Sequence, residues 1–275
     1  MNPARIAYLG PPGTYSEQAA YGHYPGARLI AFPSVSRVVE AIESGLADGG
    51  VAAIENSIEG SVTDTIDVLV HGTDLKVCGE VLVRVEHCLM ARAGSSLAEI
   101  HVVYSHPQAL AQCRGYIEGE LPRARVEPSH STALAAAQAM SADGAAAIGT
   151  RRAAEIFGLE VLAEGIQDVA LNMTRFVTIG REDAARSGDD KTSIAYSVEH
   201  RPGSLVRSLQ AFADRGVNLT KIESRPSRTE LGTYIFLVDC EGHREDPTVA
   251  EALAAVRDQS SFFKLLGSYP RARSG

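Results

Sequence analysis

The 275-residue sequence predicts an α/β protein with a two-lobed N-terminal region and a smaller C-terminal domain. From Arg5 to Gly180, short β-branched segments alternate with segments of helical period, which is typical of parallel sheets with crossover helices. Residues 181–190 are polar, charged and contain a glycine, as linkers between domains often do. After this linker the pattern changes to βαββαβ, so we expect two separately folded parts.

The N-terminal region, residues 1–180, contains several short runs that predict strands. These runs are residues 6–9, 50–54, 102–105, 124–128, 146–149 and 175–180. Helices are expected to begin at capping residues, namely Thr14 with Glu17, Ser34, Ser105 with Pro107, and Thr132. Several loops should therefore end in helix N-termini with free backbone N–H groups.

A strand-rich stretch at residues 76–92 interrupts this alternation, and strand character returns at 171–180 after the last helices. Two such crossings predict two lobes, as in periplasmic-binding-protein-like folds. Ligands of such folds bind in the crevice at the carboxyl ends of strands.

The C-terminal part, residues 191–275, predicts a ferredoxin-like domain. Its expected elements are a strand at 191–198, a helix at 203–215, strands at 217–224 and 232–239, a helix at 247–257 and a strand at 261–268.

Composition excludes several classes of protein. The net charge of -8 gives no basic surface for nucleic acid, and no stretch approaches the ~18–20 uninterrupted apolar residues of a membrane span. The N-terminus lacks the features of a secretory signal, and the four cysteines lack metal-binding spacing. We therefore expect a cytoplasmic protein with reduced thiols, no metal and no membrane or nucleic-acid partner.

The loop Gly10–Thr14 follows the first predicted strand and resembles a phosphate-binding loop in its glycines. It lacks the lysine of a Walker A loop and does not match GxGxxG, so nucleotide binding is not expected. Thr14 and Glu17 fit a capping box, and a capped helix start can also bind an anion.

A second polar cluster follows the predicted strand that ends at Ile54. Glu55, Asn56 and Ser57 enter a loop where a cleft would lie, although turn chemistry alone also explains such residues.

In the segment YSHPQALAQC, Gln108 and Gln112 lie one helical turn apart behind the predicted cap Ser105. His106 is either a general acid or base, or a capping residue at the surface.

In LNMTRFVTIG, Thr174 and Arg175 open a strand, and a charge entering an apolar run needs a partner. That partner is either a ligand carboxylate, which matches a guanidinium in a bidentate pair, or a structural carboxylate such as Asp168 or Glu164.

Together, GPPGTYSEQAA, IENSIEGSVTDTIDVL, YSHPQALAQC and NMTRF, in this order and spacing, resemble the prephenate dehydratase family. The resemblance continues in RPGSL at 201–205 and NLTKIESRP at 218–226, which are similar to the ligand-binding motifs of the family's ACT domain. No room precedes Ile6 for the chorismate mutase domain of some relatives, so the resemblance implies a monofunctional enzyme. It would convert prephenate to phenylpyruvate with loss of carbon dioxide and water, without metal or organic cofactor, under regulation by phenylalanine.

The resemblance also implies roles for individual residues. The catalytic set is Thr174, Asn56, Ser105 and Gln112, and the substrate-binding set is Thr14, Glu55, Ser57, Arg175 and Phe176. We expect Thr174 to donate a hydrogen bond to the leaving hydroxyl, whereas residue chemistry alone favours Glu55 or His106 as the acid.

The expected effector site comprises Gly203, Ser204, Leu205, Asn218, Leu219, Glu223 and Ser224. Two positions depart from the family pattern: Tyr15 stands where Phe is common, and Ser204 replaces the Ala of the usual GAL motif. ACT domains of the family pair around the effector, which implies a homodimer or a dimer of dimers. An arogenate dehydratase and a non-catalytic sensor of small acids remain alternatives at this point.

Overall fold

The computed structural model describes residues 3–227 and 233–272. The chain forms two compact units, the first comprising Met1–Val62 and Leu82–Phe176, the second Thr63–Val81 and Val177–Gly275.

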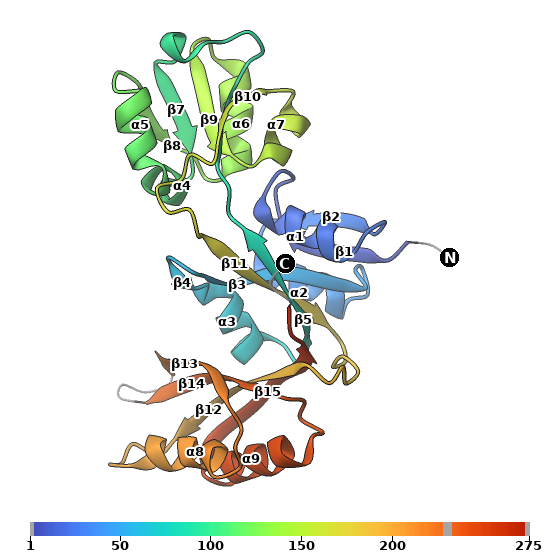
Figure 1. The fold of residues 1–275 in the computed structure, drawn as a ribbon. Coiled ribbons are helices and arrows are strands. Elements are labelled where there is room, and N and C mark those ends of the chain that lie inside the picture. The colour runs from blue at the N-terminus through green and yellow to red at the C-terminus, as the bar shows by residue number, and fades with distance from the viewer. Residues whose placement is uncertain (1–2, 228–232, 273–275) are drawn as a thin grey trace. The chain divides into compact units, whose positions relative to one another are not determined.

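One sheet of the N-terminal region has the strand order β2-β1-β3-β11-β5, and the short strand β4 pairs with β3 (Figure 1). These strands are β1 (Arg5–Leu9), β2 (Arg28–Phe32), β3 (Gly49–Asn56), β4 (Gly60–Ser61), β5 (Lys76–Arg84) and β11 (Met173–Gly180). β1 runs parallel to both β2 and β3, as the alternating pattern predicts. The helices α1 (Tyr15–His23) and α2 (Val35–Glu43) connect these parallel strands.

The second sheet has the order β10-β6-β9-β7-β8. Its strands are β6 (Cys88–Ala91), β7 (Val102–Ser105), β8 (Arg125–Pro128), β9 (Ala145–Gly149) and β10 (Glu160–Glu164). Its helical elements are η2 (Leu97–Glu99), α4 (Pro107–Gln112), α5 (Arg114–Glu120), α6 (Thr132–Ser141) and α7 (Arg151–Phe157). Every residue of β9 is buried, and α6 packs nearby through four buried alanines. Small side chains therefore bring this helix close to the sheet.

The chain crosses between the two sheets twice, through residues 85–87 and residues 165–172. The two crossings lie side by side, since the Val85 N–H donates to the Asn172 carbonyl at 2.8 Å. β7 is parallel to β8 and β9, whereas β6 is antiparallel to β9 and β10. The two-lobed α/β architecture predicted from the sequence is confirmed, with mixed rather than purely parallel sheets.

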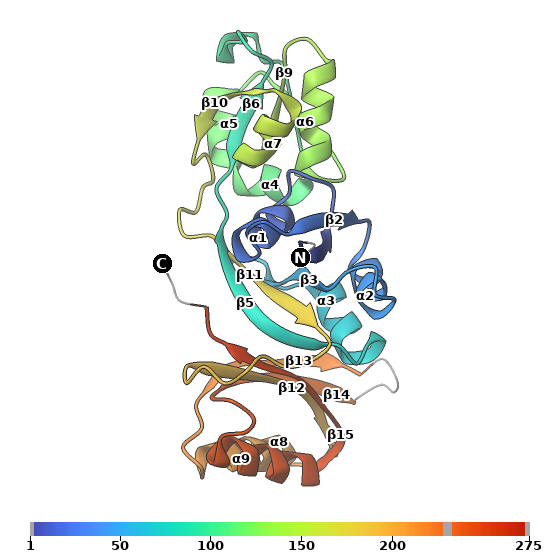
Figure 2. The same cartoon turned by 90° about the vertical axis from the view of Figure 1, so that its right-hand side faces the viewer.

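The second unit contains a four-stranded sheet in the order β13-β14-β12-β15, with antiparallel pairing throughout. Its elements are β12 (Asp190–Val198), α8 (Ser204–Ala213), β13 (Leu219–Pro226), β14 (Tyr234–Glu241), α9 (Pro247–Asp258) and β15 (Ser260–Pro270). Both helices lie on one face of this sheet (Figure 2). The βαββαβ order is as predicted; residue 232, the first of one predicted strand, lies outside the described residues.

Residues 63–81, which include α3 (Thr63–Asp67) and the π-helical turn η1 (Val68–Gly72), pack in this second unit. Lys191 forms a buried ion pair with Glu80 at 2.8 Å, and the Lys264 ammonium donates to the Val70 carbonyl at 3.0 Å. The compact units thus differ from the sequence-predicted division at residues 181–190. Buried contacts between segments far apart in the chain produce this difference.

Local structure differs from the expectation at two helix starts. Thr14 and Ser34 cap their helices as predicted. The caps of α4 and α6, however, are His106 and Ser131, each one residue from the predicted Ser105 and Thr132. In the part of the chain that the structure describes, no helix is both long and apolar enough to span a bilayer.

Candidate active site

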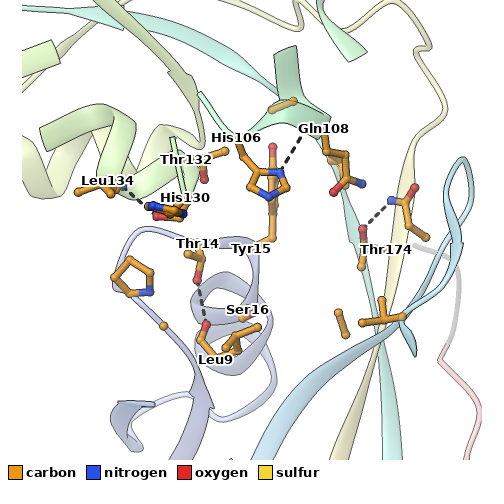
Figure 3. Close-up of a pocket in the computed structure, with 18 of the residues that line it drawn as sticks. Leu9, Thr14, Tyr15, Ser16, His106, Gln108, His130, Thr132, Leu134 and Thr174 are labelled. Atoms are coloured by element: carbon orange, nitrogen blue, oxygen red, sulfur yellow. Dashed lines mark hydrogen bonds between the residues drawn. The ribbon is translucent and has the colours of Figure 1, made fainter. Parts of the chain in front are cut away.

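A cavity of about 640 Å³ lies in the first unit and is lined by residues of both lobes (Figure 3). Residues from the first lobe and the crossings are Leu9, Gly10, Pro11, Thr14, Tyr15, Ser16, Pro33, Ala53, Asn56, Val62, Val85, His87, Thr174 and Phe176. Residues from the second lobe are His106, Gln108, Ala109, Gln112, His130, Ser131, Thr132 and Leu134. Five of the nine residues expected to bind or transform a substrate are among them.

Two helix N-termini face the cavity. The Thr14 hydroxyl accepts from the Glu17 N–H at 3.4 Å, and the Ser131 hydroxyl accepts from the Leu134 N–H at 3.0 Å. The positive ends of the α1 and α6 dipoles therefore reach this site from different lobes. Such an arrangement favours a ligand with more than one carboxylate.

Gly13 brings the loop before α1 against the second lobe. Its backbone has φ of 89°, and a Cβ there would lie 3.1 Å from the Ala153 Cα atom. The Thr150 hydroxyl donates to the Gly13 carbonyl at 2.7 Å. Only glycine combines this backbone conformation with such a close approach.

Thr174 and Asn56 form a buried pair at the cavity wall. The Asn56 amide nitrogen lies 2.9 Å from the Thr174 hydroxyl oxygen. The Asn56 carbonyl oxygen accepts from the N–H groups of Ile58 at 3.0 Å and Glu59 at 3.1 Å. These contacts fix the orientation of the amide, so Asn56 donates and the Thr174 oxygen accepts. The hydroxyl hydrogen of Thr174 is then available to donate to a ligand.

Gln112 projects from the end of α4 into the same region. Its amide oxygen receives the Asn172 amide nitrogen at 3.1 Å and lies 2.9 Å from His87 Nε2. Its amide nitrogen is buried and has no hydrogen-bond partner among residues 3–227 and 233–272. Burial lowers the pKa of His87, so the imidazole is neutral near pH 7.

In the strand β11, the side chains of Thr174 and Phe176 lie on the face opposite that of Arg175. Side chains alternate between the faces of a strand, and Thr174 and Phe176 line the cavity. The Arg175 guanidinium instead pairs with Glu55 at 3.0 Å. Its carboxylate partner is therefore neither of the two residues considered from the sequence, Asp168 and Glu164.

Ser105 and Ser57 also lie apart from the described cavity lining. The Ser105 side chain is fully buried, and its hydroxyl donates to the Ile148 carbonyl at 2.6 Å. The Ser57 N–H donates to the Met173 carbonyl at 2.8 Å, while its hydroxyl accepts from the Met173 N–H at 2.9 Å. Both serines thus join neighbouring segments of the backbone.

Several cavity residues were not singled out from the sequence as site residues, among them His87, Gln108, His130 and Ser131. The helical spacing of Gln108 and Gln112 was the available signal for one of them. His106 lines the cavity as the α4 cap, and its Nδ1 accepts from the Gln108 N–H at 3.3 Å. No cluster of three or more His, Cys, Asp or Glu side chains in the described chain is arranged to hold a metal ion.

The residues of the expected effector site lie in the second unit. Gly203 caps α8 with φ of 81°, and the buried Ser204 hydroxyl accepts from Arg207 at 3.1 Å. Asn218 is exposed before β13, on which Leu219, Glu223 and Ser224 follow. Glu223 forms an ion pair with Lys221 at 3.4 Å.

Comparison with known proteins shows the family. A model described as prephenate dehydratase matches residues 6–184, and a model described as ACT domain matches residues 192–258. The chain belongs to the prephenate dehydratase family. Within this family it is similar to the prephenate dehydratase of Mycobacterium sp. strain KMS, with 41% identity over 97% of this chain and 89% of that protein. It is 44% identical to the bifunctional chorismate mutase/prephenate dehydratase of Neisseria gonorrhoeae, covering 98% of this chain and 75% of that protein.

Solved structures of family members and relatives have the same fold. The prephenate dehydratase of Arthrobacter aurescens in complex with L-Phe has a TM-score of 0.90 and 39% identity, covering 98% of this chain and 90% of that chain. GqqA, described as a quorum quenching acylase, has a TM-score of 0.88 and 33% identity over 98% of both chains. The family resemblance inferred from the motifs is thereby confirmed.

Proposed function

We propose that the chain converts prephenate to phenylpyruvate in phenylalanine biosynthesis, as a carbon-oxygen lyase acting in the cavity of the first unit. The observation that carries this proposal is the hydrogen-bond direction at Thr174. Because its oxygen accepts from Asn56, its hydrogen is left to meet a leaving hydroxyl group.

In this reaction the ring carboxylate departs as carbon dioxide, and its bonding electron pair makes the ring aromatic. The hydroxyl group departs on the other side of the ring and leaves as water after gaining a proton. Thr174 stabilises the departing oxygen by hydrogen bonding, a contribution that grows as negative charge develops on it. Apolar neighbours such as Val85 and Phe176 keep the reacting carboxylate poorly solvated, so that loss of its charge is favourable.

The two carboxylates of prephenate fit the two helix N-termini at the cavity. Thr14 at α1 and Thr132 at α6 lie where such groups would be held, and Gln112 adds an amide donor. Ser105, Glu55, Ser57 and Arg175 are further from the substrate in this proposal. Glu55, Ser57 and Arg175 support the backbone segments that carry Asn56 and Thr174, whereas Ser105 joins β7 to β9.

Regulation by phenylalanine is the second part of the proposal. The relative from Arthrobacter aurescens was solved with L-Phe, and this chain carries the ACT motifs RPGSL and NLTKIESRP. Phenylalanine would bind where the α8 N-terminus and Asn218 of paired ACT domains meet, in a cytoplasmic homodimer or dimer of dimers. Its carboxylate would meet the helix N–H groups, and Asn218 would receive its ammonium group.

The test is to incubate the purified protein with prephenate and, separately, with arogenate. We expect phenylpyruvate from prephenate and little phenylalanine from arogenate. Faster turnover of arogenate would establish the alternative substrate, and no turnover of either would contradict an enzymatic role. The variant Thr174→Val, assayed in parallel, controls for contaminating dehydratases.

Regulation is tested by titrating phenylalanine against the wild type and Asn218→Ala. The variant should need a higher phenylalanine concentration for the same fractional change in activity. The matched control is Thr220→Ala, which alters an exposed residue in β13, two positions after Asn218. Equal responses of all three proteins would contradict the proposed effector site.

A further inference from the structure

Three buried polar side chains, Asn56, Asn172 and His87, and the half-buried Gln112 form a continuous chain of hydrogen bonds between the lobes. Asn56 in β3 is 2.8 Å from Asn172, Asn172 is 3.1 Å from Gln112, and Gln112 is 2.9 Å from His87. Asn172 and His87 belong to the two crossings between the sheets, and both side chains are almost fully buried. This chain of hydrogen bonds therefore lies where the first lobe meets the second.

The direction of each bond follows from one anchored end. Two backbone N–H groups donate to the Asn56 oxygen, so the Asn56 nitrogen must donate to the Asn172 oxygen. The Asn172 nitrogen then donates to the Gln112 oxygen. The Gln112 oxygen can only accept, so His87 meets it with a protonated Nε2.

The far end of the chain holds the imidazole in place. The Tyr15 hydroxyl lies 2.8 Å from the Glu86 carbonyl oxygen and 3.2 Å from His87 Nδ1, so its single hydrogen faces two acceptors when the ring is protonated at Nε2. The backbone N–H of His87 donates to the Gln167 side-chain oxygen at 3.0 Å. The ring therefore lies between Gln112 at Nε2 and Tyr15 at Nδ1, on a backbone held by Gln167.

This directional order leaves two donors for the cavity, one in each lobe. Asn56 uses its nitrogen on Thr174, whose hydroxyl can then donate outward. The Gln112 side-chain oxygen accepts hydrogen bonds from Asn172 and His87. Its buried amide nitrogen has no hydrogen-bond partner among the residues that the structure describes. A buried unpaired donor is unfavourable in the empty protein, and a substrate oxygen would satisfy it.

We propose that His87 and Asn172 are positioning residues for the dehydratase reaction, because they hold Gln112 with its amide nitrogen toward the substrate. This proposal rests on the proposed function. Asn172 has a second task, since it also accepts from Asn56 and so helps to aim the Asn56 nitrogen at Thr174. Neither residue is expected to exchange a proton with the substrate.

His87 could affect activity by positioning Gln112, as proposed, or only by stabilising the fold through its other contacts. A double-mutant cycle separates the two roles, because a residue that acts through Gln112 loses its effect when Gln112 is already changed. The cycle combines His87→Phe with Gln112→Met, and kcat, KM and the unfolding midpoint are measured for each protein with prephenate.

We expect His87→Phe to lower kcat about tenfold when Gln112 is unchanged. A loss of this size lies within the range of interaction energies measured for residues in contact. KM should change less than kcat, and His87→Phe should have little further effect in the Gln112→Met background. His87→Gln should restore most of the lost kcat, because its amide can still donate to Gln112. Equal loss of kcat in both backgrounds, or no loss in either, would overturn the proposal.

Asn172 gives an independent test that does not depend on an aromatic substitution. Asn172→Asp keeps the size and the acceptor for Asn56 but cannot donate to Gln112. Its kcat should fall while Asp168→Asn, a change outside the chain of hydrogen bonds, leaves kcat near the wild-type value. Wild-type kcat in Asn172→Asp would overturn the role of this residue. Because wild-type activity is measured first, failure of the proposed function itself appears as no turnover in the unmodified protein.

Discussion

The amide nitrogen of Asn56 lies 2.9 Å from the hydroxyl oxygen of Thr174, although 118 positions separate the two residues in sequence. The pair joins the end of β3 to the start of β11, which are neighbouring strands in the first sheet. A threonine hydroxyl is a weak acid, so its use at a leaving group depends on its orientation. Asn56 supplies that orientation from a buried position.

The first prediction is that Asn56→Asp lowers turnover of prephenate by about 10²-fold, a typical loss for a misdirected donor in the transition state. The aspartate oxygens can accept from the Ile58 and Glu59 N–H groups, but they cannot donate to Thr174. Steady-state kinetics should show the change in kcat, with a smaller change in KM. Unaltered kcat would show that the direction of this bond is irrelevant to catalysis.

The second prediction concerns Arg175, whose side chain is 10% exposed and pairs with Glu55. Arg175→Lys should lower the free energy of unfolding by about 1–2 kcal/mol. This is less than for a fully buried ion pair, because the Glu55 side chain is partly exposed to solvent. Glu55→Gln should have a similar effect, and KM for prephenate should change little in either variant.

The measurements for Arg175 are urea unfolding and steady-state kinetics on the same preparations. A several-fold rise in KM for Arg175→Lys without loss of stability would favour the direct carboxylate contact that the sequence motif implies. Glu55→Gln serves as the matched control, since it removes charge from the ion pair and leaves the guanidinium intact.

The third prediction follows from the buried imidazole of His87. Burial lowers its pKa below the ordinary value of 6.5, so the unfolded chain binds a proton at a higher pH than the folded chain does. Its contribution to stability is complete above about pH 6.5 and is lost as the pH falls toward the folded-state pKa. As the pH falls below about 6.5, the free energy of unfolding of the wild type should therefore decrease relative to that of His87→Gln. The decrease should be at most about 1.4 kcal/mol per pH unit.

Urea unfolding of both proteins at pH 7.5 and pH 5.5 checks this expectation. A difference between wild type and variant that does not change with pH would contradict a neutral buried imidazole.

Much of the fold could be predicted from the sequence, because strand and helix periods and linker composition are local properties. Three strands, β2, β4 and β10, were not predicted. β2 is half-exposed along its length, and β10 is an edge strand with exposed glutamates at both ends. β10 and the two-residue β4 lack the apolar run that marks β9 or β3, whereas β2 carries one at residues 29–32 and could have been predicted from it.

The site was predicted only in part, since its geometry depends on contacts between distant residues. The alternation of side chains in β11 could have placed Thr174 and Phe176 on the side opposite Arg175. The family motif contains all three residues and does not distinguish the two faces of the strand. His87 and Asn172 gave no local signal, because each belongs to a connection and acquires its partners only when the two lobes meet.

The central claim is that the Thr174 hydroxyl donates to the leaving group of prephenate, and the most direct measurement is kcat of Thr174→Val. Valine keeps the shape and removes the donor, so we expect kcat to fall about 10²–10³-fold while substrate affinity is nearly retained. Thr174→Ser retains a hydroxyl beside Asn56 and should keep substantial activity. Near-wild-type kcat in Thr174→Val would contradict this role of Thr174 and would favour His106 as the acid.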